Sequence, residues 1–154
     1  MFKYATNLKL LDGVTVEVTY QDGKVIQFDL SQMFDKYPQL KELKDNRDLF
    51  LKGHLDPGGF GIIWNDELDF DATSIYECGI LIKQIEPTIN QKLGLLIAKT
   101  REEKGITQAE LAKLSHIDQS DISRLEKGQG NPTLSKISKL LESLESDIDF
   151  IIKK

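Results

Sequence analysis

A short polar stretch in the second half of the chain has the side chains and the spacing needed to read a nucleic acid. On an α-helix, at about 100° per residue, Ser120, Ser123, Arg124 and Lys127 fall on one side, with Gln119 near the helix start. Arginine can fork onto O6 and N7 of guanine, and glutamine can pair with N6 and N7 of adenine. Hydroxyl and ammonium groups bind phosphates. These residue types indicate a surface that contacts DNA.

Two short helices must position this surface. Ile122 and Leu125 lie opposite the polar side chains, and we expect them to anchor the reading helix in a core. Asp118 is the predicted N-cap of that helix, and Thr107 with Glu110 predicts a capping box at the start of the preceding one. A helix enters the major groove only if it protrudes, and two short helices joined by a tight turn achieve this.

Two longer helices are predicted on either side of this pair. The first begins near residue 91 and ends before Gly105, with an apolar stripe at Leu93, Leu96, Ile97 and Thr100. The second covers "TLSKISKLLESL", with predicted inward residues Leu134, Ile137, Leu140, Leu141 and Leu144. The tail "DIDFIIKK" alternates and is predicted as a strand, which could pair across a dimer or dock on the N-terminal sheet.

The stretch "TQAELAKLSHIDQSDISRLEKGQGNPTLSKISKLLESL" resembles the helix-turn-helix of the lambda repressor/Cro class, often called the Xre family. The resemblance covers roughly residues 91–145 and rests on the patterns Q-x-x-L-A, I-S-R-L-E-x-G and N-P-T-L. It implies five helices, of which the sequence pattern indicates four. It also implies a glycine with positive φ in the turn, where this chain has His116, at a cost of about 1 kcal/mol.

The family binds double-stranded DNA, and the resemblance implies roles for individual residues. It places three side chains at base edges: Gln119, Ser120 and Arg124. It places four near the phosphate backbone: Gln108, Ser123, Lys127 and Gln129. It also implies a structural ion pair between Arg101 and Glu126. Asp121 adds a negative charge beside this surface, which would weaken the approach of phosphates or select against some sequences.

In the first half of the chain, apolar residues recur at every second position, as in a strand, and not with the spacing of a helix. Val14, Val16 and Val18 alternate with polar residues, and Asp-Gly pairs at 12–13 and 22–23 predict tight turns between antiparallel strands. Further strands are predicted in "DLFLKGHL" and "FGIIW", on either side of a "DPGG" turn. Short helices are predicted from Ser31 through "QMFDKY" and in "ATSIYECG". We expect an α+β domain, an antiparallel sheet with short helices.

This half also resembles a family of small bacterial domains of unknown function. The resemblance covers about residues 3–78, with a Tyr-x-Asp-Gly hairpin in "VEVTYQDGKVIQFDL" and a strand that runs from glycine to tryptophan in "GFGIIW". Some members are fused to helix-turn-helix modules. The resemblance implies an α+β fold without a defined chemistry, and the toxin–antitoxin-like settings of such domains hint at a protein partner.

We predict no catalytic, cofactor or metal site. His54 and Asp56 would need a third ligand, and the acidic residues of 66–71 lack the spacing and the glycine of a calcium loop. "DPGGFG" lacks the Lys-Ser/Thr of a phosphate loop. Cys78 has no basic neighbour in the sequence and is expected to be a buried thiol. Four aromatic residues are expected in the core: Phe60, Trp64, Phe70 and Tyr76.

Charge and composition differ between the two halves. Residues 91–154 hold 11 Lys/Arg and 10 Asp/Glu, a net charge of +1, whereas residues 1–90 hold 9 and 15, a net charge of −6. The acidic half should repel phosphates, so only the second half suits DNA. The single cysteine excludes an internal disulfide, and no apolar stretch reaches bilayer length, so the cytoplasm is the expected location.

We therefore expect three segments. They are an α+β domain of unknown function at 1–79, a linker at 80–90, and a helix-turn-helix DNA-binding domain with a C-terminal strand at 91–154. The predicted function is a sequence-specific DNA-binding transcriptional regulator, acting as a homodimer, whose N-terminal domain binds a partner or senses a ligand. Two alternatives stay open: an antitoxin-type regulator that binds a toxin protein through its N-terminal domain, and a protein-interaction module without DNA binding.

Overall fold

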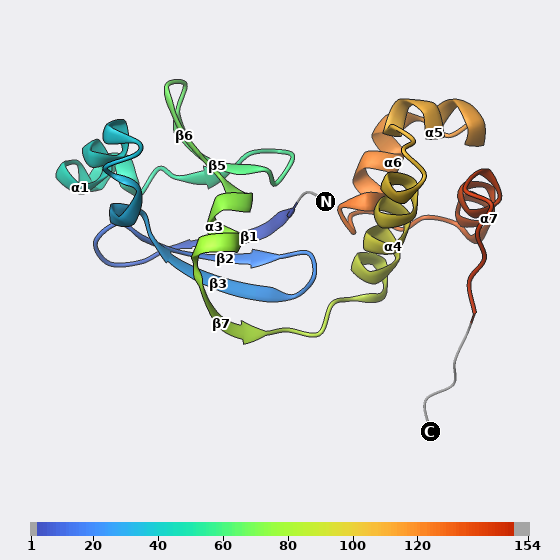
Figure 1. The fold of residues 1–154 in the computed structure, drawn as a ribbon, viewed down its shortest axis with the longest axis horizontal. Coiled ribbons are helices and arrows are strands. Elements are labelled where there is room, and N and C mark those ends of the chain that lie inside the picture. Colours follow the sequence, from blue (N-terminus) through green and yellow to red (C-terminus); the bar gives the residue numbers. More distant parts are fainter. Residues whose placement is uncertain (1–2, 150–154) are drawn as a thin grey trace. The chain divides into compact units, whose positions relative to one another are not determined.

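The computed structural model describes residues 3–149, which form two units divided between Pro87 and Thr88 (Figure 1). The strands of the N-terminal unit are β1 (Ala5–Leu10), β2 (Thr15–Tyr20), β3 (Lys24–Asp29), β4 (His54–Leu55), β5 (Gly61–Asn65), β6 (Leu68–Asp71) and β7 (Ile80–Gln84). Its helices are the 3-10 helices η1 (Leu30–Met33) and η2 (Pro38–Lys41), and the α-helices α1 (Glu42–Asp45), α2 (Arg47–Phe50) and α3 (Ala72–Cys78).

Two antiparallel sheets make up the N-terminal unit, with the order β1-β2-β3-β7 in one and β4-β5-β6 in the other. Gly13 and Gly23 have φ of 65° and 85°, at the turns that the Asp-Gly pairs predict. Val16 and Val18 on β2 are fully buried, as their alternation predicts. Helix α3 ends before Gly79, also as predicted. The expected α+β architecture with short helices is confirmed.

Three local predictions in this unit are wrong. The helix after β3 is a 3-10 turn capped by Asp29, whose carboxylate accepts the Ser31 N–H at 2.9 Å, so Ser31 is not the cap. The predicted strand in "DLFLKGHL" begins in helix α2, because the Asn46 side chain accepts the Leu49 N–H and caps that helix, and only its last two residues, His54 and Leu55, form strand β4. Residues 80–84, expected as the start of a linker, form β7 and pair with β3.

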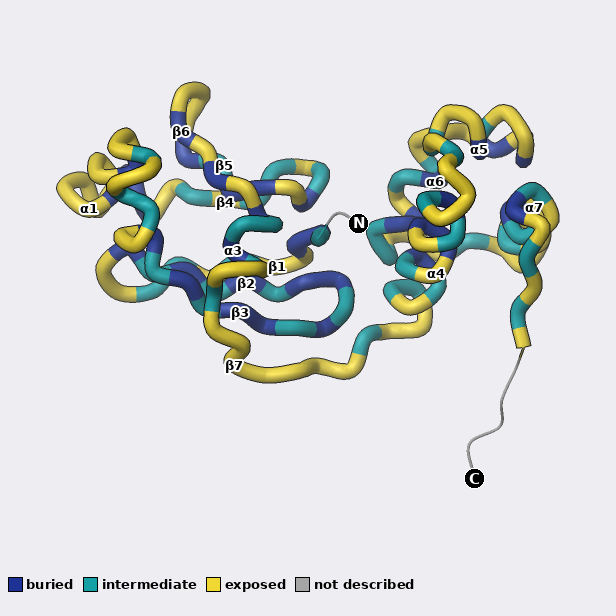
Figure 2. The backbone as a smooth tube through the Cα atoms, in the orientation of Figure 1, coloured by how far each residue is buried: buried dark blue, intermediate teal, exposed yellow. Residues whose placement is uncertain are grey.

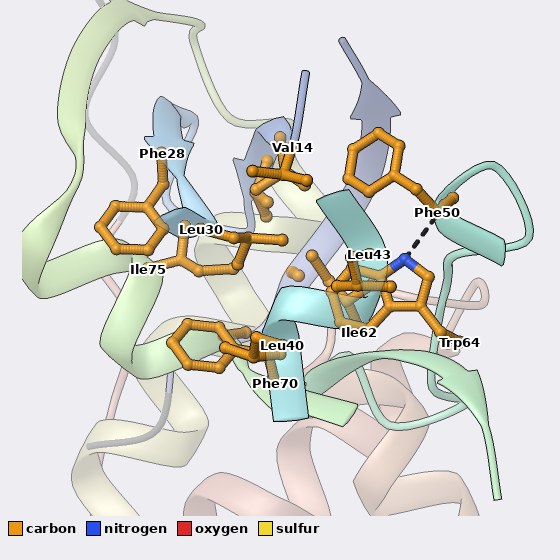
Figure 3. Packing of buried hydrophobic residues seen from close by; sticks show 14 of the residues in the cluster. Val14, Phe28, Leu30, Leu40, Leu43, Phe50, Ile62, Trp64, Phe70 and Ile75 are labelled. Atoms are coloured by element: carbon orange, nitrogen blue, oxygen red, sulfur yellow. Dashed lines mark hydrogen bonds between the residues drawn. The ribbon is translucent and has the colours of Figure 1, made fainter. Parts of the chain in front are cut away.

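The core of the N-terminal unit lies under the helices, and it is dominated by aromatic and branched side chains (Figure 3). Trp64 is 3% exposed, and its indole Nε1 donates to the Phe50 carbonyl at 3.0 Å. Phe70 is also buried, as expected. Phe60, however, is 41% exposed and packs edge-on against Tyr4.

Two further N-terminal side chains are not fully buried. Tyr76 is partly buried against the core, and its ring packs edge-on against that of Tyr20. Cys78 is exposed, because α3 turns Ala72 and Ile75 inward and ends at the cysteine. The expected buried thiol is therefore wrong.

The second unit consists, in its described part, of four helices. They are α4 (Ile89–Glu103), α5 (Gln108–Ser115), α6 (Gln119–Glu126) and α7 (Leu134–Ser143). Their shared core contains Ile97, Leu111, Ile122, Leu125, Leu140 and Leu144. Helix α4 starts earlier than predicted, because Thr88 and Gln91 form a capping box.

Some predicted inward residues of this unit do not reach the core. Leu96 is 45% and Leu134 is 75% exposed, so the apolar stripes are narrower than predicted. The predicted C-terminal strand falls mainly on residues 150–154, which lie outside the described residues. None of the helices within residues 3–149 is long and apolar enough to cross a membrane.

Candidate nucleic-acid interface

Helix α5 begins and ends at residues that fix its length. The Thr107 hydroxyl accepts the Glu110 N–H, and the Glu110 carboxylate accepts the Thr107 N–H at 2.7 Å, which closes the predicted capping box. The bond from the Thr107 backbone is the main reason that the pKa of Glu110 lies below its ordinary value. The helix ends at His116, whose φ of 54° is the positive value predicted for the turn.

Helix α6 is anchored by two apolar side chains. Ile122 is fully buried and Leu125 is 6% exposed, and both belong to the same core cluster as Leu111 of α5. Asp118 occupies the N-cap position, as predicted, although its side chain makes no capping hydrogen bond. After the helix, Gly128 has a φ of 70°, which ends the helical path. The short helix is therefore fixed by its apolar underside and by its two ends.

The outer side of α6 carries the polar residues that we predicted as the reading surface. Four of them are exposed: Gln119, Ser120, Arg124 and, in the following loop, Gln129. Ser123 and Lys127 are half-buried on the same helix side. The structure thus places the five of these residues within 119–127 on one side of α6, opposite Ile122 and Leu125, and Gln129 in the loop that follows. Their contacts with DNA stay a prediction.

A buried carboxylate connects α4, α5 and α6. Glu126 is 0% exposed and accepts hydrogen bonds from Arg101 Nε at 2.6 Å and Arg101 Nη2 at 2.9 Å. Gln108 Nε2 donates to the same carboxylate at 2.8 Å, and Arg101 Nη1 donates to the Ile106 carbonyl at 2.9 Å. The two residues that the resemblance pairs are therefore in a two-pronged contact, which holds the end of α6 against α4.

Lys136 on α7 forms an ion pair with Asp121, the acidic residue beside the predicted reading surface. Its Nζ donates to Asp121 Oδ2 at 2.5 Å, and this bond is the main cause that keeps the pKa of Asp121 below its ordinary value. Sequence reasoning noticed the charge of Asp121 but missed its partner. No periodic pattern pointed to Lys136, since the contact depends on where α7 lies in the folded unit.

Family models match both halves of the chain. A model described as "Helix-turn-helix" matches residues 97–151, and one described as "Protein of unknown function (DUF2442)" matches residues 5–80. An uncharacterized HTH-type transcriptional regulator of Haemophilus influenzae is 31% identical over 93 residues, which are 59% of this chain and 86% of the relative. The chain belongs to the helix-turn-helix family of transcriptional regulators. It is a DNA-binding regulator with an α+β N-terminal unit.

Solved structures similar to this regulator include two bacterial proteins. The restriction-modification controller protein C.AhdI of Aeromonas hydrophila is 38% identical, with 36% of this chain and 85% of that chain covered and a TM-score of 0.36. A putative DNA-binding protein of Nitrosomonas europaea is 14% identical, with 92% of this chain and 86% of that chain covered and a TM-score of 0.44.

The described part of the regulator's N-terminal unit has an acidic groove. Within residues 3–149, no three or more His, Cys, Asp or Glu side chains are arranged to hold a metal ion, and His54 is exposed. A groove of about 350 Å³ lies between η2, β5 and β6, and its lining includes Tyr37, Asp56, Phe60 and Asp69. Carboxylates and aromatic rings both attract cations.

Proposed function

We propose that the regulator reads double-stranded DNA by inserting α6 into the major groove. In this pose Gln119, Ser120 and Arg124 contact base edges. The observation that carries the proposal is their common exposure on the helix side opposite the buried Ile122 and Leu125. A helix anchored in this way presents its side chains without a further folding step, so the ordering entropy of binding stays small.

Four residues around α6 contact the phosphate backbone in this pose: Gln108, Ser123, Lys127 and Gln129. The bond from Gln108 Nε2 to Glu126 supports this role, because it fixes the amide and leaves a second N–H on that nitrogen to donate to a phosphate. The ion pair between Lys136 and Asp121 supports it as well. A partnered carboxylate repels phosphates less than an isolated one does.

The regulator acts as a two-fold homodimer on DNA. One recognition helix makes few base contacts, and specific binding by such modules uses two half-sites about 34 Å apart. Two symmetric copies would therefore require a palindromic operator.

The acidic N-terminal groove supports a second candidate function, binding of a basic segment of a partner protein, as in an antitoxin-type regulator. Residues 1–90 carry a net charge of −6, and Asp69 in the groove is exposed. A fluorescent oligoarginine peptide should bind less tightly to the Asp69→Asn variant than to wild type. The control Asp35→Asn removes the same charge from an exposed turn and should have a smaller effect. Equal losses in both variants would show only non-specific attraction.

Selection from random duplexes at low salt tests the DNA proposal. The full chain is incubated with a randomised library, and bound duplexes are recovered and sequenced over several rounds. We expect an enriched palindrome with half-sites about one helical turn apart. Recovery without any shared sequence would contradict specific reading by α6. It would favour a protein-interaction module with residual charge attraction.

A further inference from the structure

Strand β7 is an edge strand with an unusual surface. It ends the sheet order β1-β2-β3-β7 and pairs with β3 on one side only. Ile80, Leu81 and Ile82 are 69%, 54% and 46% exposed, and Figure 2 shows the whole strand in the colour of exposed residues. Since consecutive side chains of a strand point to opposite faces, aliphatic surface lies on both sides of this edge.

The opposite edge of the same sheet is engaged at its first residue. On β1, the Ala5 N–H donates to the Gly59 carbonyl at 2.8 Å, from the loop before β5. Among residues 3–149, β7 is the edge of this sheet that exposes large aliphatic side chains, so it suits pairing with another strand. An open edge made of branched aliphatic residues is a template for such pairing.

We propose that β7 pairs antiparallel with β7 of a second copy of this chain, about a two-fold axis at Ile82. The proposal rests on the dimer of the proposed function and names its interface. In this register Leu81 lies opposite Lys83 of the partner subunit, and Ile80 lies opposite Gln84 of the partner subunit. No like charges face each other, and the aliphatic stem of lysine covers leucine. An axis at Lys83 would instead place two ammonium groups opposite each other, which is unfavourable.

The two-fold symmetry of the proposed contact limits it to a closed pair. The β3–β7 register shifts between Val25 and Ile26, and Lys83 puts a charge on the edge. Both features weaken pairing at an edge strand, so the proposed contact depends on the aliphatic side chains of Ile80, Leu81 and Ile82. A two-fold contact uses the same surface on both copies, so it closes on itself and leaves no edge for a third chain.

The length of chain after β7 suits a DNA-binding dimer. In the proposed register the two Gln84 residues are four strand positions apart, roughly 14 Å. Five residue steps separate Gln84 from Ile89, the start of α4, and each step spans at most about 3.6 Å. The two α4 helices can therefore begin up to roughly 50 Å apart. Half-sites about 34 Å apart are within that reach.

Sedimentation equilibrium of the full chain without DNA tests the interface through opposite charges at one position. We expect a dimer for wild type and a dimerisation constant at least ten-fold weaker for Leu81→Lys, which faces the partner's Lys83. Leu81→Glu, which faces the same lysine, should keep the dimer. The control Leu51→Lys changes a residue that is 53% exposed elsewhere and should leave the constant unchanged. Equal weakening by Leu81→Lys and Leu81→Glu, or a monomeric wild type, would overturn the proposal.

Cysteine cross-linking tests the register independently of affinity. In a Cys78→Ser background, Ile82→Cys places two thiols directly opposite each other, at a separation that a disulfide spans. Mild oxidation should link these chains into a covalent dimer, whereas Ile80→Cys, about 14 Å from its counterpart, should stay unlinked. Equal cross-linking of both variants would overturn the register. Neither measurement involves DNA, so an enriched palindrome together with a monomeric chain would reject β7 pairing and leave the proposed function standing.

Discussion

Replacing Arg101 by methionine should unfold much of the second unit. The change removes two hydrogen bonds, at 2.6 and 2.9 Å, from a Glu126 carboxylate that is fully buried. The hydrogen bond from Gln108 Nε2, a neutral donor, does not replace the positive charge of Arg101. Removing one partner of a buried ion pair typically costs about 3–5 kcal/mol. A unit of this size has roughly 3–9 kcal/mol of stability in total.

Two optical probes follow the units separately during urea unfolding. Far-UV circular dichroism is dominated by α4–α7, and fluorescence reports the only tryptophan, Trp64, in the N-terminal core. Arg101→Met should lower the urea midpoint of the transition seen by circular dichroism and leave the midpoint seen by Trp64 fluorescence unchanged. The double variant Arg101→Met/Glu126→Leu removes the charge as well, and we expect its stability within about 1 kcal/mol of wild type.

The double variant decides whether the reasoning is correct. If it is as unstable as Arg101→Met alone, the loss does not come from an uncompensated buried charge. A matching shift of the Trp64 transition in Arg101→Met would refute the separate stability of the two units.

Three further substitutions test other parts of the structure. Lys136→Met should weaken DNA binding in a gel-shift assay, because it leaves the Asp121 carboxylate without its cation, and adding Asp121→Asn should remove the loss; an equal loss in both backgrounds would contradict this explanation. His116→Gly should raise the free energy of unfolding of the second unit by about 0.5–1 kcal/mol and so raise its urea midpoint, because glycine tolerates the φ of 54° at this position. A lower midpoint would contradict this. Gly59→Ala should lower the free energy of unfolding of the N-terminal unit, measured by Trp64 fluorescence, by more than about 1 kcal/mol, since the new Cβ would lie 2.4 Å from the Ala5 carbonyl oxygen. An unchanged fluorescence midpoint would contradict this packing.

Local patterns in the sequence predicted those parts of the fold that depend on neighbouring residues. The Thr107–Glu110 capping box is set within a few residues and is present. The positive φ at His116, which the family resemblance implied, is present as well. The alternation in β2 also predicted its buried face, because the period of a strand is fixed by backbone geometry. The inward position of Ile122 follows from helical spacing in the same way.

The features that sequence reasoning missed depend on distant partners. Strand β7 looked like a linker because its pairing partner, β3, lies more than fifty residues away. The Lys136 contact with Asp121 joins two helices whose packing no local pattern encodes. The helix at Arg47–Phe50 is different, since the cap at Asn46 was readable in the sequence and was outweighed by a run of apolar residues.

Fluorescence anisotropy of a selected duplex tests most directly whether α6 reads DNA. Titrations would compare wild type, Arg124→Ala and the control Lys99→Ala, whose side chain is 63% exposed on α4. Arg124→Ala should lose about 1–3 kcal/mol of binding free energy and should no longer discriminate at one base pair of each half-site. Lys99→Ala should bind nearly as wild type does. Unchanged affinity and unchanged base discrimination in Arg124→Ala would contradict the assignment of α6 as the reading helix.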